Sequence, residues 1–163
     1  MTSQTLNKKQ LINTQIKLMN ANLNHIAKFK TFTKTENLES IRKFIFKNST
    51  KFGFNEYKAE ELVLAVDEAC TNLIKHAYKS DSQSSITIEI KSNKTNLIVN
   101  IIDNSPAFDP RYVKDPNMIE YRDEYRKGGL GIFIMKSLVD SIDYKTINNG
   151  EFKNILTLVK QLK

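Results

Sequence analysis

Glu68, Asn72 and His76 are the residues of this chain whose types and spacing first suggest chemistry. They recur at every fourth position of a stretch with apolar periodicity, residues 61–78, so a helix would stack them along one side. A carboxylate and an amide oxygen one turn apart can orient a water or a hydroxyl and can hold Mg²⁺, which prefers oxygen ligands. The same spacing also fits an amphipathic helix whose polar side faces water. Taken alone, the stretch favours that ordinary helix.

A glycine-rich run, Gly128-Gly129-Leu130-Gly131, precedes a second stretch with helical periodicity. Glycines let backbone N–H groups approach a phosphate, and the start of a helix is electrostatically positive. The run is not a P-loop, because no Gly-Lys-Ser/Thr follows it. It is not the dinucleotide fingerprint either, because no parallel β-α-β unit surrounds it. By itself it is a weak indication of an anion site.

The elements that must position these residues can be read from periodicity and turn formers. Alternation predicts strands, three- and four-residue apolar steps predict helices, and Gly53 is expected to end the first helix. Antiparallel strands with helices on one face predict an α+β fold, a two-layer sandwich. The expected order is a strand at 25–33, a helix from Leu38, the central helix at 55–78, a hairpin of 86–90 with 97–102, a helix from Ile132, and a hairpin of 143–147 with 152–159 across the turn Asn148-Asn149-Gly150.

Two segments stand outside this pattern. Residues 1–24 are rich in Asn, Gln and Lys and contain no acidic residue, yet their apolar residues keep a helical spacing. They form either a frayed tail or an added amphipathic helix, and the tail is favoured because short isolated helices are marginal. Residues 25–163 are expected to form one domain. Within it, the charged residues 111–127 are too long for a simple connection and predict a lid, mobile without ligand.

Composition and charge limit the classes of function and partner that remain. The 163 residues carry a net charge of +7, which fits nucleic acid, an acidic protein or a phosphorylated ligand. Because acidic residues are mixed among the basic ones, direct nucleic-acid binding is the weaker interpretation. The single cysteine, Cys70, is expected to be a small core residue. No apolar run approaches membrane-spanning length, so we expect a cytoplasmic protein that does not enter a membrane.

Three elements then occur in one order: Glu68, Asn72 and His76 on a helix, Asp103 after an apolar strand, and the glycine-rich run after a lid. Together they resemble the ATP-binding site of the GHKL superfamily of gyrase, chaperone and histidine-kinase ATPases. The chain is more closely similar to the bacterial anti-sigma factor serine/threonine-protein kinases, a resemblance that runs from about residue 27 to 162. The matching segments are Glu68–Asn72, His76–Tyr78, Phe108–Pro110 and Gly128–Ile132.

The resemblance implies a histidine-kinase-like ATPase fold and a role for each matching residue. Asn72 would ligate the Mg²⁺ that bridges the phosphates of ATP, and Glu68 would be the general base for a substrate hydroxyl. Asp103 would accept a hydrogen bond from the adenine amino group, and Ser105 stands where the family usually has glycine. The phosphates would be held at Gly128, Gly129, Leu130 and Gly131.

Two positions are left open by the resemblance. His76 is interpreted as a supporting residue and not as a phospho-acceptor, because it lies two turns beyond Glu68 and no phospho-acceptor domain is present. The threonine that often contacts adenine from the last strand has no clear counterpart. Asn154 and Ile155 occupy its place, and Thr157 lies two residues further on.

The implied partners are a sigma factor, held inactive, and a small anti-sigma antagonist phosphorylated on Ser or Thr. A homodimer is left open. The alternative is a non-catalytic module of the same fold that regulates a protein partner by sequestration, an interpretation that depends on Ser105. A basic nucleic-acid-binding domain is the third interpretation, and it would show affinity that falls steeply with salt.

Overall fold

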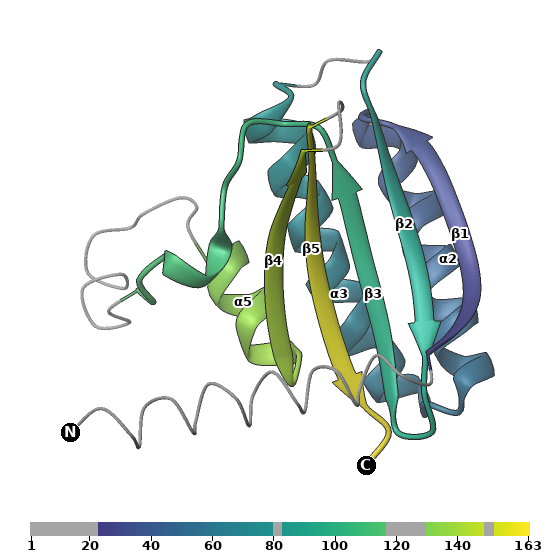
Figure 1. Ribbon diagram of the computed structural model, residues 1–163. Helices are drawn as coiled ribbons and strands as arrows, with labels where there is room; N and C mark the ends of the chain where they lie inside the picture. Colours follow the sequence, from purple (N-terminus) through teal and green to yellow (C-terminus); the bar gives the residue numbers. More distant parts are fainter. Residues whose placement is uncertain (1–22, 80–82, 117–129, 149–151) are drawn as a thin grey trace.

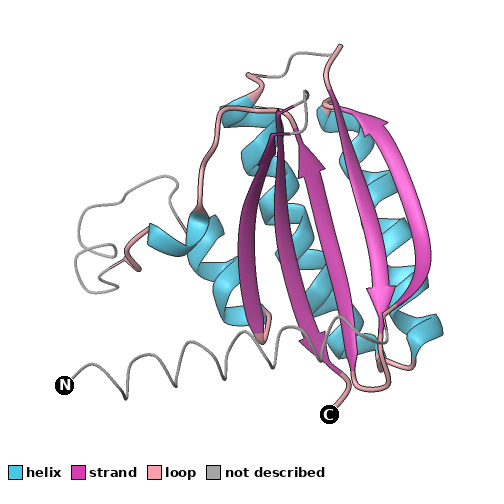
Figure 2. Cartoon of the chain, in the orientation of Figure 1, coloured by secondary structure: helices cyan, strands magenta, loops and turns pink. Residues whose placement is uncertain are grey.

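The computed structural model describes residues 23–79, 83–116, 130–148 and 152–163. Within them, five antiparallel strands form one sheet in the order β1-β2-β3-β5-β4, and the helices cover one of its faces (Figures 1 and 2). The predicted two-layer α+β sandwich is confirmed. The elements are β1 (Asn24–Phe32), α2 (Leu38–Phe52), α3 (Glu56–Asn72), a π-helical turn (Leu73–Ala77), β2 (Ser85–Ser92), β3 (Asn96–Asp103), α5 (Gly131–Leu138), β4 (Ser141–Asn148) and β5 (Phe152–Gln161), with short 3₁₀ helices at Thr35–Asn37 and Pro110–Tyr112.

The junction between α2 and α3 follows the local signals in the sequence. Gly53 ends α2 with φ of 117°, a left-handed conformation that glycine adopts without steric cost. The Asn55 side chain then accepts a hydrogen bond from the backbone N–H of Lys58 at 2.9 Å and caps the start of α3. Both boundaries predicted for this region are therefore confirmed.

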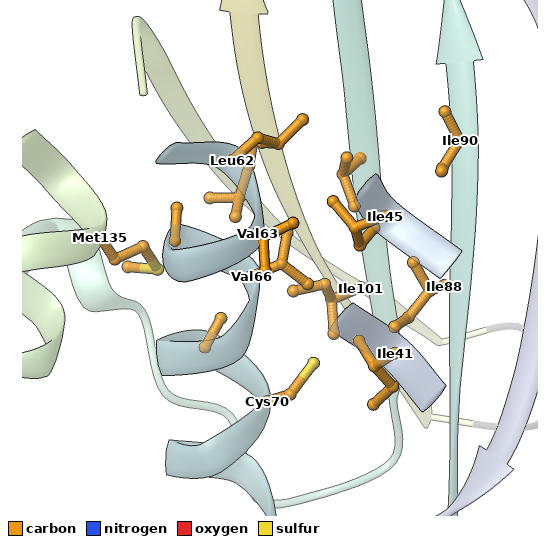
Figure 3. Packing of buried hydrophobic residues seen from close by; sticks show 14 of the residues in the cluster. Ile41, Ile45, Leu62, Val63, Val66, Cys70, Ile88, Ile90, Ile101 and Met135 are labelled. Carbon is orange, nitrogen blue, oxygen red and sulfur yellow. The ribbon is translucent and has the colours of Figure 1, made fainter. Parts of the chain in front are cut away.

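The core lies between the sheet and the helix layer, and aliphatic side chains from both fill it (Figure 3). Ile88 and Ile90 of β2 alternate with polar residues and are completely buried, as are Ile41 and Ile45 of α2. Burying one such side chain contributes about 1.5–3 kcal/mol. Cys70 of α3 is also completely buried in this core, which confirms the expectation that it is a packing residue.

The central helix departs from the prediction at its end. It was expected to continue regularly to Tyr78, but its last five residues form a π-helical turn. The backbone N–H of Tyr78 donates to the carbonyl of Leu73, five residues back, at 2.9 Å. The wider turn changes which side chains face the core, so Ile74 is completely buried whereas Leu73, the expected stripe residue, is only partly buried. The apolar periodicity could not show this, because either residue can serve as the core position.

The order of the strands places two distant segments side by side. β5 lies between β3 and β4 although it is the last strand in the chain. α5, which comes between β3 and β4 in the sequence, lies on the helix side of the sheet (Figure 1). Met135 of α5 is buried against α3 (Figure 3). The antiparallel register of β3 and β5 puts Asp103 directly opposite Asn154. Within the described residues, no helix has both the length and the apolar character needed to cross a membrane.

Candidate functional site

A cavity of about 550 Å³ opens between the end of α3, the end of β3 and the start of α5. Most of its wall is apolar, and its polar side chains include Asn72 at the end of α3 and Asp103 at the end of β3. A mostly apolar pocket with a few convergent polar groups is typical of a small-ligand site. The apolar wall includes Leu73, Ile132, Met135 and Leu156.

Glu68 and Asn72 meet the start of α5 at one edge of this cavity. A Cβ built on Gly131 would stand 2.5 Å from Glu68 Oε2 and 3.6 Å from Asn72 Nδ2. The two polar side chains of α3 therefore lie against the first residue of α5, which is where the glycine-rich run ends. The structure brings these three predicted site residues together.

Asp103 is held at the opposite side of the cavity and is only 4% exposed. Its Oδ1 accepts a hydrogen bond from the backbone N–H of Ser105 at 2.7 Å and from Asn154 Nδ2 at 3.2 Å. The Tyr78 hydroxyl lies 3.5 Å from the same oxygen and accepts a hydrogen bond from the backbone N–H of Asn104 at 2.8 Å. The π-helical turn thus places the Tyr78 hydroxyl against the turn that follows β3.

Ser105 fits this turn without backbone strain. Among the described residues other than glycine, only Lys79 has a positive φ, so Ser105 keeps a conformation open to any residue. Ser105 is 3% exposed, and its hydroxyl donates to the carbonyl of Pro106 at 3.3 Å. The replacement of glycine by serine therefore gives no structural reason to doubt a ligand site here.

The segment after Asp103 is anchored more firmly than the sequence indicated. The backbone N–H of Phe108 donates to the Tyr144 hydroxyl at 3.0 Å. The Arg111 guanidinium binds the carboxylates of Asp109 and Asp143, each at 2.7 Å. The predicted lid, residues 111–127, therefore begins with a short 3₁₀ helix in which Arg111 is a structural anchor, not a free cation. Residues 117–127 lie outside the described residues.

Two groups beside the cavity have shifted acidities. Burial raises the pKa of Tyr78 to about 12, and the nearby Asp103 carboxylate acts in the same direction. Burial also raises the pKa of the Cys70 thiol far above its usual value. A buried thiol that resists ionisation is not a nucleophile. Cys70 therefore plays no chemical part in this site.

The other predicted residues have mixed outcomes. Gly128 and Gly129 lie outside the described residues. Leu130 precedes α5, and its carbonyl accepts the first hydrogen bond of the helix, from the N–H of Ile134 at 2.8 Å. His76 is exposed and belongs to the cavity wall, so it borders the site itself and does not merely support the residues of α3.

Sequence reasoning missed three residues that build this site: Tyr78, Tyr144 and Asn154. Tyr78 belongs to the segment His76–Tyr78 that matches the family, but its contacts with Asp103 and Asn104 depend on the π-helical turn. Tyr144 is a partly buried strand residue whose hydroxyl receives a loop N–H from 36 positions earlier. Asn154 was noticed without a role, because only the strand order places it opposite Asp103.

The polar side chains at the two sides of the cavity have the chemistry needed to bind Mg·ATP. The Asn72 amide offers an oxygen ligand that suits Mg²⁺, and the Glu68 carboxylate lies beside it at Gly131. The described residues hold no cluster of three or more acidic, His or Cys side chains that would bind a metal unaided. Mg²⁺ commonly uses one or two protein oxygens and completes its shell with phosphates and water. The apolar wall suits a flat base, and the Asp103 carboxylate can accept a hydrogen bond from an amino group on it.

Comparison with known proteins agrees with this geometry. Residues 32–160 match the family described as the histidine kinase-like ATPase domain, and the chain belongs to this family. The chain is also 30% identical over 118 residues to the serine-protein kinase RsbW of Bacillus licheniformis, covering 69% of this chain and 73% of that protein. It is 34% identical over 98 residues to RsbW of Listeria monocytogenes, covering 58% and 62%. The family predicted from the motifs is confirmed.

Solved structures share the fold at low sequence identity. A chain of the SiaB–SiaC complex from Pseudomonas aeruginosa superposes with a TM-score of 0.62 at 12% identity, covering 97% of this chain and 99% of that chain. The RsbU and RsbW domains of Rv1364c from Mycobacterium tuberculosis give a TM-score of 0.54 at 15% identity, covering 84% and 33%. These likenesses support the predicted histidine-kinase-like architecture.

Proposed function

We propose that this protein is a Mg²⁺-dependent serine kinase that transfers the γ-phosphoryl group of ATP to a serine or threonine of a partner protein. One observation carries the proposal. Glu68 and Asn72 converge on Gly131 at one edge of the cavity, and Asp103 is held at its other side. Phosphoryl transfer needs this division between a site that holds the nucleotide and a base that faces the acceptor.

Each side chain then has a defined task. Bound Mg²⁺ would neutralise charge on the phosphates, and the Asn72 amide oxygen would be its protein ligand. Glu68 would orient the acceptor hydroxyl and take its proton, and Asp103 would accept a hydrogen bond from the adenine amino group. The glycine-rich run that ends at Gly131 would present backbone N–H groups to the phosphates.

The proposed physiological role is that of an anti-sigma factor in a partner-switching module. Relatives at 30–34% identity carry the name serine-protein kinase RsbW, which supports this role. We propose that the protein sequesters a sigma factor and phosphorylates a small antagonist of that sequestration, without binding nucleic acid directly. Because sigma factors work with RNA polymerase, the proposed location is the cytoplasm. Residues 25–163 would form the catalytic domain, with residues 1–24 as an extension.

Glu68→Gln tests the proposal most directly. The amide keeps the size of the side chain but cannot take a proton, so transfer of labelled phosphate to candidate antagonists should fall by about 10²- to 10⁴-fold. Mg·ATP affinity measured by calorimetry should change little. Glu60→Gln is the matched control, because Glu60 is an exposed residue of the same helix outside the cavity.

Two results would contradict the proposal. Undiminished transfer by Glu68→Gln would remove Glu68 from the role of base. Absence of Mg·ATP binding by the unmodified protein, with Asn72→Ala behaving identically, would instead favour the non-catalytic module that acts by sequestration alone.

A further inference from the structure

We propose that Asn154 is the positioning residue that sets the preference for an adenine base, by fixing which oxygen of Asp103 faces the ligand. The inference rests on the proposed function, since it concerns the base of the nucleotide. Asn154 is 1% exposed and stands opposite Asp103 in the β3–β5 ladder. Asn154 does not itself line the cavity, but it contacts Asp103 and Ser105, which do.

The Asn154 amide joins two points of that turn. Its Nδ2 donates to Asp103 Oδ1 at 3.2 Å and to the carbonyl of Ser105 at 2.8 Å. A carboxylate and a backbone carbonyl are both acceptors, so only the nitrogen of the amide can face them. The amide oxygen points the other way, where the Thr146 hydroxyl lies at 3.5 Å. The orientation of the amide thus follows from its partners and is not an arbitrary assignment.

These contacts make the two oxygens of Asp103 different. Oδ1 is occupied by the Ser105 N–H, the Asn154 amide and the more distant Tyr78 hydroxyl. Among the described residues, no hydrogen bond reaches Oδ2. Oδ2 is therefore the oxygen left for a ligand, and it accepts hydrogen bonds but donates none. A base with an amino group at the matching place satisfies it, whereas a base without one leaves a desolvated carboxylate oxygen unpaired.

A threonine at position 154 could not make both of these hydrogen bonds. Its hydroxyl carries one hydrogen, so it could donate to Asp103 Oδ1 or to the Ser105 carbonyl but not to both. The two donor hydrogens of the amide hold the carboxylate and the turn together. This bridge also closes the turn around Ser105, which stands there in ordinary backbone conformation. Asn154 therefore couples the rotamer of Asp103 to the backbone beside it.

The test compares ATP with purine riboside triphosphate, which lacks only the amino group. Affinities are measured by calorimetry with Mg²⁺, and transfer rates are measured at saturating nucleotide. The unmodified protein should prefer ATP by roughly 10- to 100-fold, the usual worth of a hydrogen bond to a charged group. Asn154→Leu should reduce this preference to within a few-fold, mainly through weaker ATP binding, with little change in the saturated rate.

Two further variants separate positioning from general damage to the fold. Asn154→Thr keeps one donor and should give an intermediate preference, and it remains informative if Asn154→Leu does not fold. Thr157→Val is the matched control on the same strand, because the Thr157 hydroxyl bonds Asn100 and not the cavity. It should leave the preference unchanged.

The outcomes are distinct. If the Asn154 variants lose affinity for both nucleotides by the same factor, or keep the full preference for ATP, the inference is wrong while the kinase proposal stands. If the unmodified protein binds neither nucleotide, the proposed function fails and the inference fails with it.

Discussion

Gly131 lies so close to Glu68 that a side chain at position 131 would clash with the Glu68 carboxylate: a Cβ there would stand 2.5 Å from Glu68 Oε2. Real Cβ atoms do not approach another heavy atom so closely, so any other residue at 131 would displace the carboxylate. Glycine at position 131 therefore allows the Glu68 carboxylate to keep its present position, in addition to any contact with phosphate. This constraint links the start of α5 to the proposed base.

Gly131→Ala should reduce phosphoryl transfer by at least about 10-fold while leaving the free energy of unfolding nearly unchanged. The atom in conflict is the far end of a flexible side chain, so the fold can adapt by moving Glu68, but a general base must stay within hydrogen-bond reach of its substrate. Transfer assays and urea denaturation measure the two effects. Gly53→Ala is the opposite control, because its φ of 117° predicts a stability loss of about 1 kcal/mol with normal kinetics. Normal transfer by Gly131→Ala would show that Glu68 need not keep this position.

Arg111→Ala should loosen the segment after Asp109 without unfolding the protein. The Arg111 guanidinium holds Asp109 and Asp143, and its hydrogen bonds lower the pKa of Asp109. Because these ion pairs are partly exposed, the free energy of unfolding should change by less than about 1 kcal/mol. Amide hydrogen exchange of Tyr112 and Val113 should become faster. Lys114→Ala, which removes an exposed cation nearby, should leave exchange unchanged, and equal exchange in both variants would rule out the anchor.

Tyr78 should titrate later than an ordinary tyrosine. Its folded pKa of about 12 lies above the usual value of 10.0, so folding favours the protonated phenol. The contribution of this pKa difference to the free energy of unfolding is complete below about pH 10 and is lost as pH rises towards 12. Absorbance titration of tyrosine ionisation in Tyr78→Phe and the unmodified protein should differ by one late component. The unmodified protein should also lose more stability between pH 10 and 12 than Tyr78→Phe, and parallel losses would contradict this assignment.

The ion pair between the buried Lys160 and the partly buried Glu61 should matter for stability and not for phosphoryl transfer. Lys160 Nζ lies 2.8 Å from Glu61 and donates to the carbonyl of Leu138, at the end of α5, at 2.7 Å. Lys160→Met leaves the acid and the carbonyl without this donor and should lower the free energy of unfolding by about 3 kcal/mol. The double variant Lys160→Met with Glu61→Leu should recover part of that loss. Urea denaturation measures both, and additive losses would mean that the pair contributes no coupling.

Local order was largely readable from the sequence. The alternation in β2, the apolar steps of α2, the end of α2 at Gly53 and the start of the central helix near residue 55 are short-range effects, each decided by a few neighbouring residues. The family and several candidate site residues followed from motifs whose spacing is also local. The sequence by itself therefore determined the elements, their approximate bounds and the class of protein.

The tertiary structure decided what depends on contacts between distant residues. The π-helical turn could not be read from periodicity, since Leu73 and Ile74 are equally apolar and only packing against the sheet selects Ile74. Asn154 gained a role only when β5 paired with β3 and placed its amide opposite Asp103. The contact of Gly131 with Glu68 likewise needs α5 packed on α3. Strand order and helix packing are set by the sum of many long-range contacts, and no local pattern records that sum.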